Sequence, residues 1–215
     1  MVATPELKKP RVMTPEEFLE WEYYQEGRYE YVDGRIIEMA GESPEHNEIS
    51  GKIYRLIGNA IERPRCKAYF AEVRVRVSAT RYRYPDITAL CGTPQFADTR
   101  PRTLLNPQIV IEVLSSSTRE IDFIDKLAEY IALDSVTDYL IFEQNQMRAF
   151  HYRPANPMAW TAQIYNTPEA VIALETIGVT LALADIDRNI ALPAPRTETS
   201  ETENQTESET DNAAL

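Results

Sequence analysis

Two acidic side chains interrupt stretches that are otherwise apolar and typical of buried strands. Asp86 stands directly before the apolar residues 87–90, and Glu112 lies inside the run QIVIEVLS, residues 108–115. Carboxylates are seldom buried unless they are paired or bound to a cation, and two of them on neighbouring strands would repel each other without one. The pattern favours a site for a hard cation, Mg²⁺ or Mn²⁺, with the backbone carbonyl of Val113 as a further oxygen ligand. An ion pair between either acid and an arginine is the alternative.

A lysine follows these acids on the next predicted helix. Lys126 lies one helical turn after Asp122. A cation beside a metal can orient the attacking water or neutralise developing charge when a phosphodiester is hydrolysed. An ordinary i,i+4 pair with Asp122 is the alternative for this lysine. With the two acids, Lys126 completes a candidate site for metal-dependent hydrolysis.

A third acid lies in a predicted hairpin. The sequence RYEYVDGRIIEM contains Asp-Gly at residues 33–34, which is the strongest short signal for a two-residue hairpin turn. In the register that this turn sets, Glu30 shares its face with apolar residues, because directly paired residues lie on the same side. Such an acid needs a partner, either the same metal or an arginine such as Arg28 or Arg35.

The other elements can be predicted from caps and periodicity. A helix begins after Thr14, with Glu17 completing a capping box. A second helix begins after Ser43 and carries His46 in its first turn, where this side chain could contact a phosphate or a carboxylate. Strands are predicted at residues 68–77, 87–90, 108–115, 136–142, 147–152 and 160–165, with one or two more in 170–183. The helix of Lys126 is predicted to bury Ile121, Ile124, Leu127, Ala128 and Ile131. This order predicts an α/β fold, a sheet flanked by helices.

Length and charge distribution indicate how the chain is divided into a domain and two ends. The 215 residues carry a net charge of −12, of which the tail from residue 193 onward contributes −5. The predicted organisation is an N-terminal extension (residues 1–13), one domain (14–192) and an acidic disordered tail (193–215). The stretch 52–83 is basic, with nine Lys/Arg and two acids, and is expected either to steer phosphates or to form ion pairs with acids elsewhere.

The sequence also suggests where the protein works. No apolar run is long enough to span a bilayer, and no signal peptide is evident, so we expect no membrane association and a cytoplasmic location. Cys66 and Cys91 fit no metal-binding spacing, and we expect them to be reduced thiols.

The motifs together resemble a known family. MTPEEFLEW, YEYVDGRIIEM, SPEHNEISGKI, YPDI, IVIEVLSSSTREIDFIDKLAEYIAL and DYLIF resemble the "putative restriction endonuclease" family abundant in cyanobacteria, part of the PD-(D/E)XK nuclease superfamily, over about residues 14–190. The resemblance implies a restriction-endonuclease-like fold, a central mixed β-sheet flanked by helices, with metal acids at Asp86 and Glu112. The superfamily lysine is expected two residues after the acid, where this chain has Leu114. The resembled family looks like one in which this lysine has moved to the following helix. In this chain the corresponding residue is Lys126.

The early glutamate of the family corresponds to Glu30, and its helix-start histidine corresponds to His46. The resulting expectation is a Mg²⁺-dependent DNA endonuclease, and a homodimer, because two-fold symmetry suits the cutting of both strands. A non-catalytic nucleic-acid-binding or regulatory module that keeps the nuclease fold is the alternative.

Overall fold

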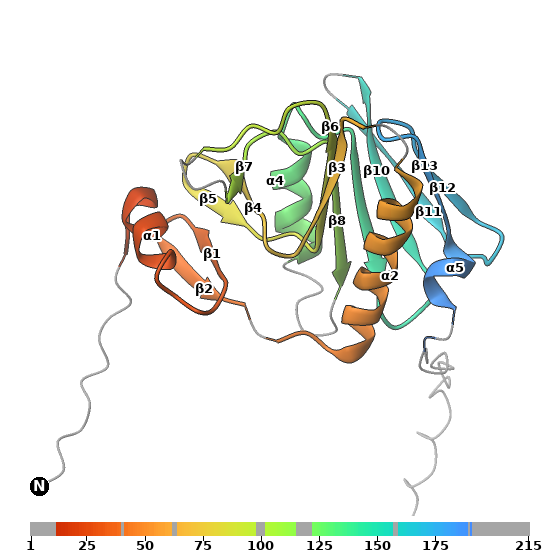
Figure 1. Cartoon of the computed structure of the whole chain (residues 1–215), viewed down its shortest axis with the longest axis horizontal. Helices are drawn as coiled ribbons and strands as arrows, with labels where there is room; N and C mark the ends of the chain where they lie inside the picture. Colours follow the sequence, from red (N-terminus) through yellow and green to blue (C-terminus); the bar gives the residue numbers. More distant parts are fainter. Residues whose placement is uncertain are drawn as a thin grey trace, which may run out of the picture.

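Two sheets and a small hairpin make up the described part of the molecule (Figure 1). This computed structural model describes residues 12–39, 41–61, 64–97, 102–114, 122–156, 159–188 and 190. The predicted N-terminal extension up to residue 11 and the predicted acidic tail lie outside these residues. None of the helices in the described ranges is both long and apolar enough to cross a membrane.

The N-terminal elements form a five-stranded sheet. Its strands, in the order β2-β1-β5-β4-β7, are β2 (Arg35–Glu38), β1 (Tyr29–Val32), β5 (Arg81–Arg83), β4 (Arg74–Ser78) and β7 (Thr103–Leu104). Helix α1 (Pro15–Glu22) packs against this sheet through Phe18, which stacks on Tyr31 with 4.9 Å between ring centroids. The predicted capping box of α1 is confirmed. The predicted hairpin is also confirmed, with Glu30 opposite Ile37.

The second sheet has six strands and holds the main core. Its order is β11-β10-β9-β8-β6-β3, from β11 (Ala159–Tyr165), β10 (Ala149–Asn156), β9 (Asp138–Glu143), β8 (Ile109–Leu114), β6 (Ile87–Cys91) and β3 (Cys66–Phe70). The sheet is mixed, because β8 and β9 run parallel while its other pairs are antiparallel. The predicted central mixed sheet flanked by helices is confirmed.

The two faces of the six-stranded sheet pack against different helices (Figure 1). On one face, helix α2 (Pro44–Ala60), the hairpin of β12 (Val171–Leu174) and β13 (Val179–Ala182), and the short helix α5 (Leu183–Asp187) cover the sheet. On the other face lie β4 and helix α4 (Leu127–Ile131), which continues a π-helical turn, η1 (Asp122–Lys126). Strand β8 sends alternate residues to each face, and Glu112 lies between Val110 and Leu114, which face α4.

Two sequence predictions are wrong in detail. The single strand expected at residues 68–77 is two strands, β3 and β4, which belong to different sheets and are separated by a turn with Ala71 in the left-handed region at φ 54°. On the helix that contains Lys126, the side chains that are buried differ from the apolar ones expected. Ile124 is 66% exposed, whereas Lys126, Glu129 and Tyr130 are buried. A π-helical turn has more residues per turn than an α-helix, so it changes which side chains face inward.

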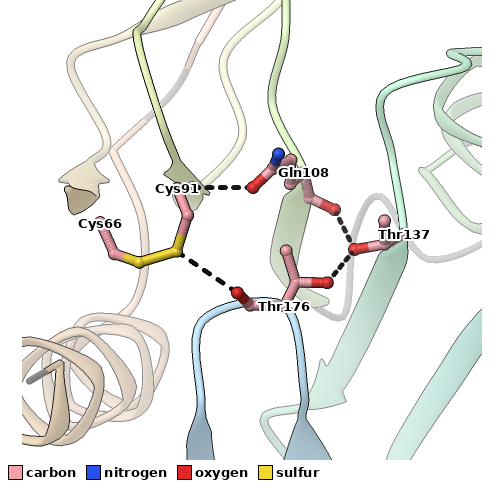
Figure 2. Close-up of a disulfide and its surroundings, with 5 residues drawn as sticks. All are labelled: Cys66, Cys91, Gln108, Thr137 and Thr176. Atoms are coloured by element: carbon pink, nitrogen blue, oxygen red, sulfur yellow. Dashed lines mark hydrogen bonds between the residues drawn. A yellow bond between two sulfur atoms is a disulfide. The ribbon is translucent and has the colours of Figure 1, made fainter. Parts of the chain in front are cut away.

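The structure also corrects the prediction for the two cysteines. Cys66 and Cys91 lie directly opposite each other in the antiparallel pair of β3 and β6, and they form a disulfide (Figure 2). The expectation of reduced thiols is therefore wrong. It failed because the register of two strands 25 residues apart could not be read from the sequence. The Cys91 amide donates to Gln108 Oε1 at 2.7 Å, and the Cys91 sulfur lies 3.3 Å from the carbonyl oxygen of Thr176 (Figure 2).

Candidate active site

The candidate site lies where β6 begins and β8 ends. Ile87 pairs with Ile111, so extending the antiparallel register by one residue places Asp86 opposite Glu112. The amide of Val113 donates a hydrogen bond to Asp86 Oδ2 at 2.8 Å. Because the N–H and C=O of a strand residue point toward the same neighbour, the Val113 carbonyl is directed toward the Asp86 side as well. The fold thus brings the two predicted metal acids and this carbonyl to one place.

Asp86 has one occupied and one open oxygen. His46, from the first turn of α2, places Nε2 at 3.1 Å from Asp86 Oδ2, the oxygen that also accepts from Val113. Among the described residues, Asp86 Oδ1 has no hydrogen-bond or ion-pair partner. Burial by itself would lower the pKa of His46, but the hydrogen bond and charge of Asp86, with the charges of Glu42 and Glu112, outweigh burial and raise it. The predicted contact of His46 with a carboxylate is therefore made to Asp86.

Lys126 points inward from the π-helical turn. Its side chain is buried, and Nζ lies 3.2 Å from Glu112 Oε1 and 3.3 Å from Oε2. The same ammonium lies 3.5 Å from Glu30 Oε1. The side chain of Asp122, its alternative partner, lies outside the described residues. Single π-helical turns occur often at functional sites, and this one ends on the candidate lysine.

Glu112 is held from a second side by a tyrosine that the sequence did not single out. Tyr130 is fully buried on α4, and its hydroxyl donates to Glu112 Oε1 at 3.0 Å. Burial, followed by the charge of Glu112, raises the pKa of Tyr130 well above its usual value. The phenol therefore stays protonated and remains a donor. Residues three and four positions after Lys126 share its helical face, and this spacing is the signal that could have identified Tyr130.

Glu30 finds an arginine, but not one of those expected. Arg83 Nη1 lies 2.7 Å from Glu30 Oε2, and the amide of Tyr84 donates to Oε1 at 3.4 Å. Arg28 instead donates to the carbonyl of Ala71 at 3.0 Å, so its expected pairing with Glu30 is wrong. The local hairpin could not indicate a partner that lies 53 residues later in the chain.

Arg83 links Glu30 to helix α4, because it pairs with Glu129 of that helix as well as with Glu30. Its Nε and Nη2 donate to the two oxygens of Glu129 at 2.6 and 2.8 Å, which is a bidentate pair. Burial would lower the pKa of Arg83, but the hydrogen bonds and charges of Glu129 and Glu30 outweigh burial and raise it. Arg81 also donates to Glu129 Oε1 at 2.8 Å, and it pairs with Asp33 as well. Buried charges therefore alternate in sign from Glu129 through Arg83 and Glu30 to Lys126 and Glu112.

The basic stretch at residues 52–83 is only partly available to phosphates. Arg74 is 2% exposed and pairs with Glu22 under α1. Arg81 and Arg83 have the carboxylate partners just described. Among the residues of this stretch that the structure describes, the exposed Lys/Arg side chains are Arg55, Arg65, Lys67 and Arg76. Arg74 and Arg76 lie two residues apart on β4, but Arg74 is buried while Arg76 is exposed.

The donor set at this site fits a hard cation with few protein ligands. Among the described residues, no group of three or more His, Cys, Asp or Glu side chains is arranged to hold a metal ion. Mg²⁺ keeps several waters and binds proteins through one or two carboxylates, so such a group is not required. The open oxygen of Asp86, the carboxylate of Glu112 and the carbonyl of Val113 are oxygen donors of the kind that Mg²⁺ prefers.

Known proteins similar to this chain agree with the fold and with the family that the sequence motifs resemble. Residues 15–184 match the Uma2 family, whose description reads "Putative restriction endonuclease". The uncharacterized protein slr1290 of Synechocystis sp. (strain PCC 6803) is 29% identical over 180 residues, which is 83% of this chain and 93% of that protein. The uncharacterized protein sll1609 of the same strain is 27% identical over 151 residues, 70% of this chain and 85% of that protein. The crystal structure of a putative nuclease belonging to DUF820 from Anabaena variabilis shares the fold, with a TM-score of 0.66 at 19% identity, over 81% of this chain and 97% of that one.

Proposed function

Since the chain belongs to the Uma2 family of putative restriction endonucleases, we propose that it is a Mg²⁺-dependent endonuclease that hydrolyses phosphodiester bonds in DNA. The observation that carries this proposal is the buried ammonium of Lys126, which lies 3.2 Å from Glu112. Glu112 is on β8, and the amide of its neighbour Val113 binds Asp86. A lysine and two acids at one end of a sheet are the parts that metal-assisted phosphodiester hydrolysis needs.

Three groups would hold the metal: Asp86 through its open oxygen, Glu112, and the Val113 carbonyl. A bound Mg²⁺ or Mn²⁺ supplies Lewis-acid stabilisation of the charge that develops on the phosphate oxygens. His46 fixes the other oxygen of Asp86, so it acts as a positioning residue for this ligand.

Lys126 orients the attacking water and stabilises negative charge near the scissile phosphate. Glu30 is an anchor for Lys126 in this proposal, since Arg83 holds one of its oxygens and Lys126 and the Tyr84 amide lie beside the other. Two buried carboxylates beside one ammonium restrict where that ammonium can go.

A non-catalytic nucleic-acid-binding or regulatory module is the second candidate. The observation that favours it is that the ammonium of Lys126 already neutralises Glu112. In such a module the charges would satisfy one another, and DNA binding would not respond to Mg²⁺ or Mn²⁺.

Nicking of supercoiled plasmid by the full chain with Mg²⁺ or Mn²⁺ separates the two candidates. We expect the parent to nick, and Lys126→Ala to be slower by about 10²–10⁴-fold, the usual cost of losing a positioned catalytic group. Lys126→Arg keeps the charge but replaces a compact ammonium with a planar fork, and it should fail as well. Arg188→Ala removes an exposed cation outside the basic stretch and is the matched control. If the parent does not nick with either metal, or if Lys126→Arg nicks as fast as the parent, the proposed role of Lys126 is wrong.

The proposal extends to location and assembly. We also propose a cytoplasmic location, where DNA is found, although disulfides such as Cys66–Cys91 are rare there. Cutting both strands of a duplex suits a two-fold homodimer. Sedimentation equilibrium of the full chain measures the assembly directly, and a monomer at all concentrations would contradict it.

A further inference from the structure

We propose that Tyr130 is a positioning residue of the metal site, which holds the carboxylate of Glu112 in the orientation that binds the metal. The inference rests on the proposed function, because it assigns Glu112 as a ligand. It concerns a residue to which neither the sequence analysis nor the superfamily signature gave a role.

The first support is the convergence of two donors on one carboxylate. Tyr130 lies four residues after Lys126, so both side chains leave the same face of the η1–α4 helix. The Tyr130 hydroxyl and the Lys126 ammonium lie 3.0 and 3.2 Å from the same oxygen, Glu112 Oε1. A carboxylate oxygen has more than one acceptor site, so it can accept both.

The second support is the difference in rigidity between these donors. A lysine ammonium sits on a flexible chain of four carbons, and that of Lys126 is shared between Glu112 and Glu30. Tyr130 is fully buried, and its ring packs against Tyr139 with 5.0 Å between centroids, in a cluster with Val75, Val110 and Ile141. Its hydroxyl therefore has a fixed place relative to β8. In this proposal the phenol of Tyr130 sets the orientation of the Glu112 carboxylate, and the ammonium of Lys126 orients the attacking water.

The third support is the cost of a polar atom in this position. The ring of Tyr130 packs among side chains such as Val75, Val110 and Ile141, where a phenylalanine would fill the same space without a buried hydroxyl. The hydroxyl is satisfied by the candidate metal ligand itself. Hydrogen-bond partners of metal ligands orient those ligands, and their loss typically weakens metal binding by about 10–100-fold.

The test is Mn²⁺ binding by the full chain, measured by calorimetry for the parent, Tyr130→Phe and Tyr139→Phe. Tyr139 is equally buried in the same cluster, so Tyr139→Phe also removes one buried hydroxyl and serves as the control. We expect Tyr130→Phe to bind Mn²⁺ about 10–100-fold more weakly than the parent, and Tyr139→Phe to bind it normally. Thermal melts in EDTA verify that both variants are folded.

The outcomes separate this inference from the proposed function. If the parent binds Mn²⁺ and nicks DNA but Tyr130→Phe binds Mn²⁺ equally well, Tyr130 is an ordinary core residue and the inference alone fails. If both variants lose the same affinity, general loosening of the core explains the loss and the inference fails as well. A parent that binds no Mn²⁺ contradicts the proposed function, and the role of Tyr130 falls with it.

Discussion

Replacing Arg83 with methionine should destabilise the fold more than any exposed substitution. Arg83 makes three hydrogen bonds with distances of 2.6–2.8 Å, two to Glu129 and one to Glu30, and all three side chains are buried. Removing one partner of a buried ion pair usually costs about 3–5 kcal/mol, because the remaining charge stays buried. Glu129 would keep Arg81, and Glu30 would keep Lys126, so the low end of this range applies. We expect a loss of about 3 kcal/mol, which corresponds to about 6–12 °C in Tm for a domain of this size.

Urea unfolding at pH 7 measures this loss, with Arg55→Met as the control. Arg55 is exposed on α2, and its replacement should change the free energy of unfolding by less than about 0.5 kcal/mol. The double variant Arg83→Met/Glu129→Met tests the cause. Because it removes both partners of the bidentate pair, it should be destabilised less than the sum of the two single variants. A cost below about 1 kcal/mol for Arg83→Met, or strictly additive effects, would refute the account of this cluster as a connected ion network.

Further predictions concern the covalent link, one buried acid and the tail. Replacing both Cys66 and Cys91 with alanine should lower the free energy of unfolding by about 3 kcal/mol, the entropy of closing a loop of this length, and dithiothreitol should lower the parent equally in the same urea titration. Burial raises the pKa of Asp187 to about 6, and its Oδ2 has no hydrogen-bond partner among the described residues. Burying the charged Asp187 carboxylate therefore lowers the free energy of unfolding above pH 6, and this loss disappears as the pH falls toward 4. Asp187→Asn should thus raise Tm at pH 7.5 and leave it unchanged at pH 4, and an equal shift at both values would contradict the assignment. A chain that ends at Leu192 should melt at the same temperature as the full chain, because the removed tail has too few apolar residues to pack, and a lower Tm would show that the tail docks.

Local signals predicted the parts of the fold that depend on few residues. The hairpin register around Glu30 follows from one Asp-Gly turn, in which Asp33 and Gly34 both have positive φ. The first residues of α1 and α2 follow from Thr14 and Ser43, whose side chains accept the expected backbone hydrogen bonds. Each of these features is decided within about four residues of sequence, so a single sequence suffices.

The candidate site was predictable only where a charge stood out against apolar neighbours. Glu112 was identified because the residues around it on β8 are apolar. Glu129 and Arg83 were not, because each looks like an ordinary surface charge until the register of distant strands is known. Their burial depends on an ion pair between residues 46 positions apart, which no periodicity shows. The π-helical turn also shifted the inward face of the lysine helix toward polar side chains, against the apolar pattern.

The disulfide between Cys66 and Cys91 also makes part of the molecule a covalent ring. This ring contains β4, β5, Arg83 and Asp86, one of the two candidate metal acids. The turn at residues 79–80 between β4 and β5 is exposed, so a protease could cut there. The two fragments would stay joined and would migrate as one chain in denaturing electrophoresis without reductant. Such a nicked molecule would keep both halves of the site in one covalent unit, whereas after reduction only noncovalent contacts would join them.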